Sequence, residues 1–291
     1  MIENKKFCII GGDLRNVKLA ESISESGNSV NIYGFNKASF DIKFNQSSTI
    51  EEAVKGSDVV IGPIPCSNDN DSINSPFHSD KILIQDVFKC MDENQIFIAG
   101  RISEKILHQA QACKIFSIDM LDREEMAVLN AIPTAEGAIQ IAMEEMPITL
   151  HNSNALILGY GRIGKTLAKM LQGIGANVYV EARKYADIAW IKSYGYKPVS
   201  LAELSQTVKE MNVIFNTIPS IVLNYDILKI LNPECLIIDL ASKPGGVDFD
   251  KAKELGLRAI WALSLPGKVA PVTAAEFIKD TVFNIIEELG V

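Results

Sequence analysis

The feature that most constrains the fold is a strand, glycine turn, helix and strand pattern within residues 154–184. The apolar run at 155–158 leads directly into Gly159-x-Gly161-x-x-Gly164, and apolar residues then recur at helical spacing. This is the order of elements in a parallel βαβ unit, because two parallel strands need a crossover connection between them. The stretch therefore predicts an α/β domain with a parallel sheet.

The three glycines have different roles in such a turn. Gly159 permits the tight turn, Gly161 lets the backbone approach a pyrophosphate, and Gly164 allows the helix to pack closely on the strand. The phosphates then face the free N–H groups at the start of that helix. Since a second strand is predicted at 178–181, we interpret the stretch as a dinucleotide site. The predicted contacts in this turn are Gly159, Gly161, Arg162, Ile163 and Gly164.

The end of the second strand indicates which nicotinamide cofactor binds. An acid there binds the ribose 2′-hydroxyl, whereas an arginine accommodates a 2′-phosphate. Counting from Gly164 places Ala182 at the acid position, and the cations Arg183 and Lys184 follow it. We therefore predict NADP as the cofactor. NAD is the alternative, because a shift of one residue would place Glu181 at the ribose.

Composition limits the partners. With 291 residues, 47% of them hydrophobic, the chain is long enough for two domains. Its formal net charge of −8 argues against nucleic acid and anionic membranes as partners. No apolar run is as long as a membrane span, and the first residues lead into a strand rather than a signal peptide. The five cysteines are scattered, so we expect reduced thiols in a cytoplasmic protein without a metal site.

The first half of the chain contains a second βαβ pattern. Gly11-Gly12-Asp13 follows a predicted strand at 6–10 and precedes a predicted helix. These glycines lack the dinucleotide spacing, so we predict a flavodoxin-like substrate domain rather than a second cofactor site. The polar stretch 68–80 is predicted to be a loop or flap.

Pro133 marks the predicted domain boundary. A proline ends the element before it, and Thr134 is a suitable N-cap for a new helix. The apolar helical pattern near the end of the chain is predicted to cross back onto the first domain. We therefore predict a substrate domain of residues 1–133 plus 272–291 and an NADP-binding Rossmann domain of residues 134–271. The expected fold class is α/β, with two Rossmann-like or flavodoxin-like parallel-sheet domains and an interdomain cleft.

Three further loops follow predicted strands of the second domain, at 216–220, 239–246 and 265–271. Ligands of open α/β sheets gather at the carboxyl ends of the strands. We therefore expect the nicotinamide ring and the substrate at these loops. The predicted cofactor contacts among them are Thr217, Pro219, Ala241 and Ser242.

Six motifs together carry a family resemblance. They are I-I-G-G-D-x-R at 9–15, I-P-T-x-E-G at 132–137, G-x-G-R-x-G at 159–164, N-T-I-P-S at 216–220, D-L-A-S-x-P-G-G at 239–246 and L-P-G-x-V-A-P at 265–271. Through them the chain resembles the dipicolinate synthase A-subunit family of spore-forming bacteria, nearly from end to end. More distantly, 265–273 is similar to the loop of D-2-hydroxyacid dehydrogenases that carries their catalytic histidine, with Gly267 and Lys268 in that place.

The resemblance implies oxidation of dihydrodipicolinate, or of its hydrated precursor, to pyridine-2,6-dicarboxylate for spore formation, with NADP as the hydride acceptor. It also implies the flavoprotein-like B subunit of dipicolinate synthase as the partner and the mother cell's cytoplasm as the location, and we expect an oligomer. Two alternatives stay open. One is another NAD(P)-dependent oxidoreductase of a small carboxylate, and the other is a non-catalytic dinucleotide-binding subunit that supports a partner chain.

A small dicarboxylate substrate requires cations and hydroxyls, and ring oxidation requires a proton acceptor. The three histidines lie outside every motif, so a histidine-dependent mechanism is disfavoured. Glu136 is predicted as the general base or, alternatively, as a first-turn glutamate favoured by the helix dipole. The predicted catalytic residues are Glu136, Ser242 and Lys243. The predicted substrate contacts are Arg15, Asp13, Thr134, Ser220, Lys243 and Lys268.

Overall fold

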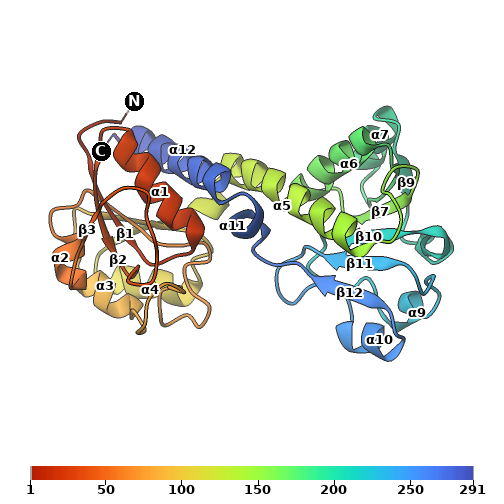
Figure 1. Cartoon of the computed structure of the whole chain (residues 1–291), viewed down its shortest axis with the longest axis horizontal. Coiled ribbons are helices and arrows are strands. Elements are labelled where there is room, and N and C mark those ends of the chain that lie inside the picture. The colour runs from red at the N-terminus through yellow and green to blue at the C-terminus, as the bar shows by residue number, and fades with distance from the viewer. Residues whose placement is uncertain (1, 291) are drawn as a thin grey trace. The chain divides into compact units, whose positions relative to one another are not determined.

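The computed structural model describes residues 2–290, and the chain forms two compact units, each built around its own parallel sheet (Figure 1). Among the described residues, the first unit contains 2–129 and 270–290, and the second contains 130–269. The predicted α/β class with two parallel-sheet domains is confirmed. The second unit is thus an insertion into the first, to which the chain returns at Ala270.

The sheet of the first unit has the strand order β3-β2-β1-β4-β5-β6, and all its pairs are parallel. The strands are β1 (Lys6–Ile10), β2 (Ser29–Tyr33), β3 (Asn45–Gln46), β4 (Val59–Ile61), β5 (Ile96–Ala99) and β6 (Phe116–Asp119). Without the short edge strand β3, this is the flavodoxin-like order, and β3 extends it to the order of a dinucleotide-binding sheet. The helices of this unit are α1 (Leu14–Glu25), α2 (Ile50–Val54), α3 (Ile84–Cys90), α4 (Glu104–Ala112), the 3-10 turn η1 (Met120–Asp122) and α12 (Pro271–Leu289).

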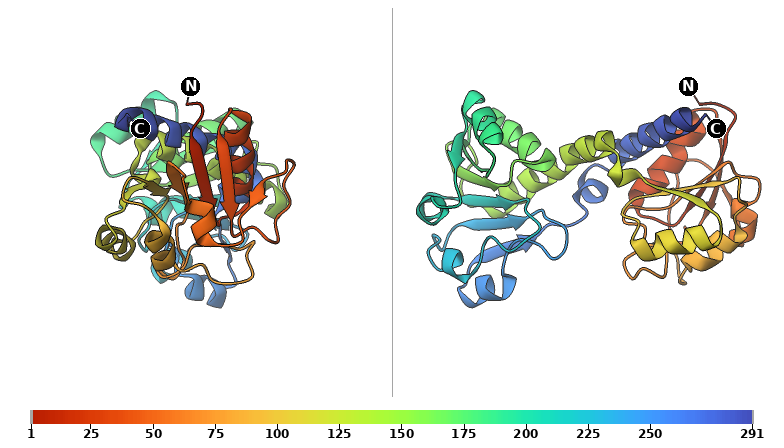
Figure 2. Two further views of the ribbon diagram at one scale, coloured as in Figure 1. Left: turned by 90° about the vertical axis from the view of Figure 1, so that its left-hand side faces the viewer. Right: turned by 180° about the vertical axis from the view of Figure 1, so that it is seen from behind.

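Both faces of this sheet are covered, as its unbroken apolar strands require. Phe7 and Ile9 of β1 face α1 and α12, while Cys8 and Ile10 face α2, α3 and α4. Figure 2 shows α12 lying beside α1, and the two helices share a buried core with the sheet. The predicted return of the C-terminal helix to the first domain is therefore confirmed. Its buried apolar residues are Ala274, Ala275, Ile278, Val282, Ile285 and Ile286.

The sheet of the second unit has the order β12-β11-β10-β7-β8-β9, again with parallel pairs only. Its strands are β7 (Asn154–Leu158), β8 (Asn177–Glu181), β9 (Lys197–Val199), β10 (Val213–Asn216), β11 (Leu236–Asp239) and β12 (Arg258–Trp261). Counted along the chain this is 3-2-1-4-5-6, the dinucleotide-binding order. The strand order switches direction beside β7, the strand that leads into the glycine turn.

Helices cover both faces of this second sheet as well. Ala155 and Ile157 of β7 pack against α5, α6 and α7, while Leu156 and Leu158 pack against α8, α9 and α10. The helices are α5 (Glu124–Glu145), which begins in the first unit, α6 (Arg162–Ile174), α7 (Tyr185–Ser193), α8 (Leu204–Thr207), the 3-10 turn η2 (Val208–Glu210), α9 (Tyr225–Leu228), α10 (Phe249–Glu254) and α11 (Leu265–Val269).

The predicted helix start at Pro133 is wrong, because α5 runs without interruption from Glu124 to Glu145 with Pro133 inside it. A proline in a helix interior costs about 3 kcal/mol. Burial of Ala135 and Ala138 against the second sheet holds the backbone helical despite this cost. The loop predicted at 265–271 also differs, since α11 occupies most of it and α12 follows almost at once.

Candidate functional site

The glycine turn between β7 and α6 has the geometry of a phosphate-binding turn. Gly159 has a φ of +93°, and a Cβ on Gly164 would lie 2.1 Å from the carbonyl oxygen of Gly159, so no side chain fits there. A Cβ on Gly161, by contrast, would meet no heavy atom within 4 Å. Gly161 is also the N-cap of α6 and makes no side-chain cap. The space beside Gly161 at the start of α6 is therefore open, and the positive dipole end of this helix suits a phosphate there.

The end of β8 separates a buried acid from exposed cations. Glu181 is only 2% exposed, its carboxylate accepts a hydrogen bond from the Gly159 N–H, and its Oε1 has no partner among the described residues. Burial raises the pKa of Glu181, and the nearby Arg183 charge and the Gly159 N–H oppose that rise. Ala182 is buried, whereas Arg183 and Lys184 are exposed. Solvent at this strand end therefore meets two cations rather than an acid.

The loop after β10 lies next to the glycine turn. Thr217 Oγ1 donates to the carbonyl oxygen of Leu158 at 2.8 Å, which fixes the start of this loop to the end of β7. A Cβ on Gly159 would lie 2.6 Å from the same Thr217 Oγ1. Pro219 and Ser220 follow and are exposed. The structure thus brings the predicted contact Thr217 to the fingerprint turn.

The loop after β11 presents two exposed polar residues. Ala241 is buried, and its carbonyl oxygen accepts a hydrogen bond from Trp261 Nε1 at 3.0 Å. Ser242 and Lys243 come next and are exposed. Because β10 and β11 are neighbours, Ser220 and these two residues belong to adjacent loops at the carboxyl end of one sheet. This is the edge at which such sheets bind ligands.

Three other predicted residues lie on helices. Thr134 is buried within α5, and its Oγ1 donates to the carbonyl oxygen of Asn130 at 2.7 Å, so it does not cap a helix. Glu136 is exposed in the middle of α5, which rules out the alternative of a first-turn glutamate. Because α5 is continuous through Pro133, no helix N-terminus with free N–H groups lies there. Lys268 is exposed on α11.

The glycine turn of the first unit is filled by the unit's own chain. The Gly12 N–H donates to the carbonyl oxygen of Asn74 at 2.8 Å. A Cβ on Gly11 would lie 2.8 Å from the Ile73 side chain. Segment 73–75 therefore covers the backbone that would otherwise approach a pyrophosphate. This turn has no room for a dinucleotide in the described arrangement.

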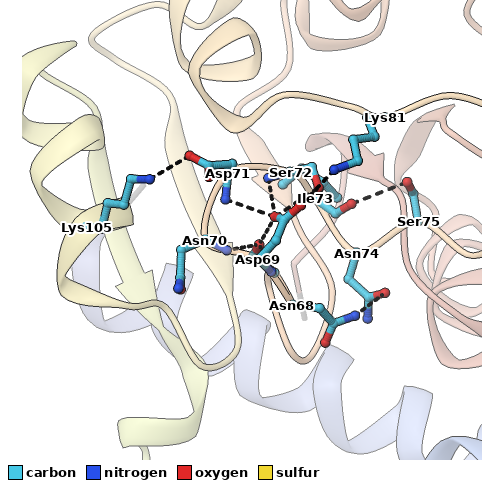
Figure 3. A network of polar contacts seen from close by, with 11 residues as sticks. Asn68, Asp69, Asn70, Asp71, Ser72, Ile73, Asn74, Ser75, Lys81 and Lys105 are labelled. Atoms are coloured by element: carbon cyan, nitrogen blue, oxygen red, sulfur yellow. Dashed lines mark hydrogen bonds and ion pairs between the residues drawn. The ribbon is translucent and has the colours of Figure 1, made fainter.

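Asp69 holds the segment that precedes residues 73–75 (Figure 3). Its carboxylate accepts hydrogen bonds from the N–H groups of Ser72 and Asp71, at 2.8 and 3.0 Å, and from the Ser72 hydroxyl. These bonds, with a further one from Lys81, hold the pKa of Asp69 far below its usual range. Lys105 Nζ donates to Asp71 at 2.6 Å from α4. The predicted loop is thus ordered by a local polar network.

Arg15 and Asp13 form an ion pair at the start of α1. Arg15 is 4% exposed, and its Nε and Nη2 donate to the Asp13 carboxylate at 2.8–3.2 Å. Its Nη2 also donates to the carbonyl oxygen of Ile64. Asp13 caps α1 through the Arg15 N–H at 3.0 Å. To bind a substrate carboxylate, Arg15 must release one of these partners, so its predicted role stays a prediction.

Neither a membrane-spanning helix nor a metal cluster occurs within residues 2–290. No helix in this range is long and apolar enough to cross a bilayer. No three His, Cys, Asp or Glu side chains in it are grouped in a way that would hold a metal ion.

Each unit matches a known protein family. Residues 6–121 match the family described as the N-terminal domain of the dipicolinate synthase A subunit, and residues 132–242 match the D-isomer specific 2-hydroxyacid dehydrogenase, NAD binding domain. The A subunit of dipicolinate synthase from Bacillus subtilis (strain 168) is 31% identical over 291 residues, with 99% of this chain and 98% of the relative covered. The chain belongs to the dipicolinate synthase A-subunit family.

Solved structures of this family match along the whole chain. The crystal structure of the dipicolinate synthase A subunit from Bacillus halodurans matches with a TM-score of 0.89 at 28% identity, covering 98% of this chain and 99% of that one. The crystal structure of the Bacillus subtilis protein matches with a TM-score of 0.89 at 31% identity, covering 100% and 98%. This member of the dipicolinate synthase A-subunit family therefore carries a dehydrogenase-type domain that binds a nicotinamide dinucleotide.

Two residues within the motifs were given no role by the sequence. Asn216 and Asp239 each end an apolar strand, and both are completely buried in the structure. The signal available in the sequence was a polar residue at the last position of a buried strand, where a charge is costly unless it is partnered. Without the pairing of β10 with β11, nothing in the sequence identifies the partner.

Proposed function

We propose that this chain is an NADP-linked oxidoreductase that oxidises dihydrodipicolinate, or its hydrated precursor, to dipicolinate for spore formation. The observation that carries the proposal is the open glycine turn at Gly161 beside the exposed cations Arg183 and Lys184. Membership of the dipicolinate synthase A-subunit family supports the substrate. A small planar dicarboxylate is also compatible with the polar and cationic loops at the carboxyl end of the second sheet.

NADP is favoured over NAD by the burial of Glu181. The acid that binds a ribose 2′-hydroxyl has to be accessible to the ribose. Glu181 is 2% exposed and is hydrogen bonded to the Gly159 N–H, while Ala182 at the acid position has no polar group. A 2′-phosphate would instead meet the guanidinium of Arg183, which suits a phosphate geometrically as well as electrostatically.

The bound nicotinamide would supply the hydride acceptor, and the protein's own part is mainly positioning. Forming an aromatic ring is intrinsically downhill, so no strong acid or base is required. Lys243, Ser242 and Ser220 would hold the substrate carboxylates from the two adjacent loops, since all three are exposed there. Glu136 is the proposed acceptor of the ring proton, because it is an exposed carboxylate on α5.

The remaining proposed substrate contacts are Arg15, Asp13, Thr134 and Lys268. Arg15 and Asp13 start from an existing ion pair, and Thr134 from a hydrogen bond to its own helix, so each would change partner on binding. Lys268 is exposed and cationic. We also propose the flavoprotein-like B subunit of dipicolinate synthase as the partner and the mother cell's cytoplasm as the location. Both rest on family membership.

The test is an assay of the purified chain with precursor generated enzymatically in the cuvette. The reduced cofactor, NADPH or NADH, and dipicolinate are measured with NADP or NAD, and with or without the partner subunit. We expect both products in equal amounts, faster with NADP, and none from the Gly161→Val variant. Dinucleotide binding without turnover, even with the partner present, would instead identify a non-catalytic subunit. Turnover of other small carboxylates but not of this precursor would refute the substrate.

A further inference from the structure

Two buried polar side chains lie side by side at the carboxyl ends of β10 and β11. Asn216 and Asp239 are opposite each other in the sheet register, and neither has any exposed surface. Burying a carboxylate is costly unless it is hydrogen bonded. The hydrogen-bond partners of this buried pair therefore decide what it does at the ligand-binding edge of the sheet.

Asp239 accepts three hydrogen bonds and so is fully partnered. Its Oδ1 accepts from Asn216 Nδ2 at 2.8 Å and from the Ala241 N–H at 3.0 Å, and its Oδ2 accepts from the Gly246 N–H at 2.8 Å. Two of these donors belong to the backbone of the loop after β11. A carboxylate has no hydrogen of its own and can accept from all three donors. An amide in its place would direct its NH2 group at one or more of them.

Asn216 holds the neighbouring loop in a similar way. Its Nδ2 donates to the carbonyl oxygen of Ile218 at 3.0 Å, and its Oδ1 accepts from the Ile218 N–H at 3.2 Å. The carbonyl oxygen of Gly246 accepts from the N–H groups of Val222 and Leu223, both at 3.0 Å, which joins the two loops. A Cβ on Gly246 would lie 2.3 Å from Asn216 Nδ2, so the loops pack closely on the pair.

We propose that Asn216 and Asp239 are positioning residues that hold the loops for the nicotinamide half of the dinucleotide. A sheet of this kind binds the two halves of a dinucleotide on the two sides of its switch point. The fingerprint turn, Arg183 and Lys184 belong to the β7 and β8 side, so the nicotinamide half belongs with β10 and β11. The inference rests on the proposed dinucleotide function.

The pair thus acts through Thr217, Ser242 and their neighbours without touching ligand itself. An asparagine at position 239 would place an N–H against either Gly246 or Asn216, and each of these already points a hydrogen at it. Asp239→Asn should therefore loosen both loops. The side chains of Asn216 and Asp239 make no hydrogen bond to β7 or β8 among those described, so that side should keep its affinity.

The experiment compares two probes by titration. NADPH carries both halves of the dinucleotide, whereas 2′-phospho-ADP-ribose lacks the nicotinamide. Asp239→Asn should bind NADPH about tenfold more weakly and 2′-phospho-ADP-ribose within about twofold of wild type. The fluorescence of bound NADPH should also shift toward that of the free cofactor. Asp226→Asn is a matched change of an exposed aspartate that pairs with Lys229, and it should change the affinity for neither probe.

A milder variant keeps the test informative if Asp239→Asn unfolds. Trp261→Phe removes the Nε1 donor to the Ala241 carbonyl while keeping an aromatic ring against Phe249. This variant should weaken the binding of NADPH about threefold and leave the binding of 2′-phospho-ADP-ribose unchanged. Equal weakening of both probes, or of neither, in folded variants overturns the positioning role. Wild-type protein that binds neither probe overturns the proposed function, and this inference with it.

Discussion

Replacing Arg183 by alanine should remove most of a preference for NADP over NAD. Arg183 is exposed directly after the buried residues Glu181 and Ala182, and its charge is close enough to Glu181 to lower the pKa of that carboxyl group. A charge-assisted hydrogen bond to phosphate contributes about 1.5 to 3 kcal/mol, which corresponds to about 10- to 150-fold in affinity. Because solvent screens an exposed charge, the lower end applies, and we expect the ratio of NAD to NADP dissociation constants to fall about tenfold.

The assay is a titration of both cofactors against wild type, Arg183→Ala and Lys184→Ala. Lysine is a point charge without the planar fork of arginine, so the Lys184 variant should lose less of the preference. The NAD affinity of the Arg183 variant should stay close to that of wild type, since NAD has no 2′-phosphate. Raising the ionic strength should reduce the wild-type preference. Equal affinity of the wild type for both cofactors would refute the assignment of this strand end.

Three further predictions concern other parts of the molecule. Gly161→Val should abolish dinucleotide binding, because the valine side chain would occupy the space of the pyrophosphate. It should not lower the thermal midpoint, because that space is open in the protein itself. Weaker dinucleotide binding by a Gly173→Ala control would contradict this assignment of the turn. Burial raises the pKa of Glu181, so the stability of the wild type falls as pH rises from the ordinary glutamate pKa through the raised folded pKa. The thermal midpoint of Glu181→Gln relative to wild type should therefore increase over that range, and a constant difference would count against it. Arg15→Ala should raise the substrate KM while the NADP Kd stays within about threefold; loss of NADP binding alone would assign the turn at Asp13 to a dinucleotide.

Features that depend on neighbouring residues in the chain were predictable from the sequence. The roles of Gly159 and Gly164 follow from spacing alone, and the structure places each where a side chain would be strained or would clash. The strands and the C-terminal helix follow from apolar periodicity. The parallel class follows in turn, because alternating strands and helices leave few other arrangements.

What could not be predicted depends on contacts between distant segments. Pro133 lies in a helix because packing on a sheet overrides a local rule. The filling of the Gly12 turn by Asn74 and the pairing of Asn216 with Asp239 join segments that the sequence leaves separate. The burial of Glu181 also required the structure, since the sequence alone left it available to a ribose.

The insertion of the second unit into the first has a consequence for biosynthesis. Helix α12 covers one face of the first sheet, yet it is translated after all of residues 130–269. When synthesis has passed residue 269 but not yet α12, the second unit is complete and can fold, whereas the Phe7 and Ile9 face of the first unit is covered by α1 without α12. Domains usually complete in the order of synthesis, N-terminal first. In this chain the N-terminal unit is completed last, and until then the apolar surface that α12 buries stays exposed.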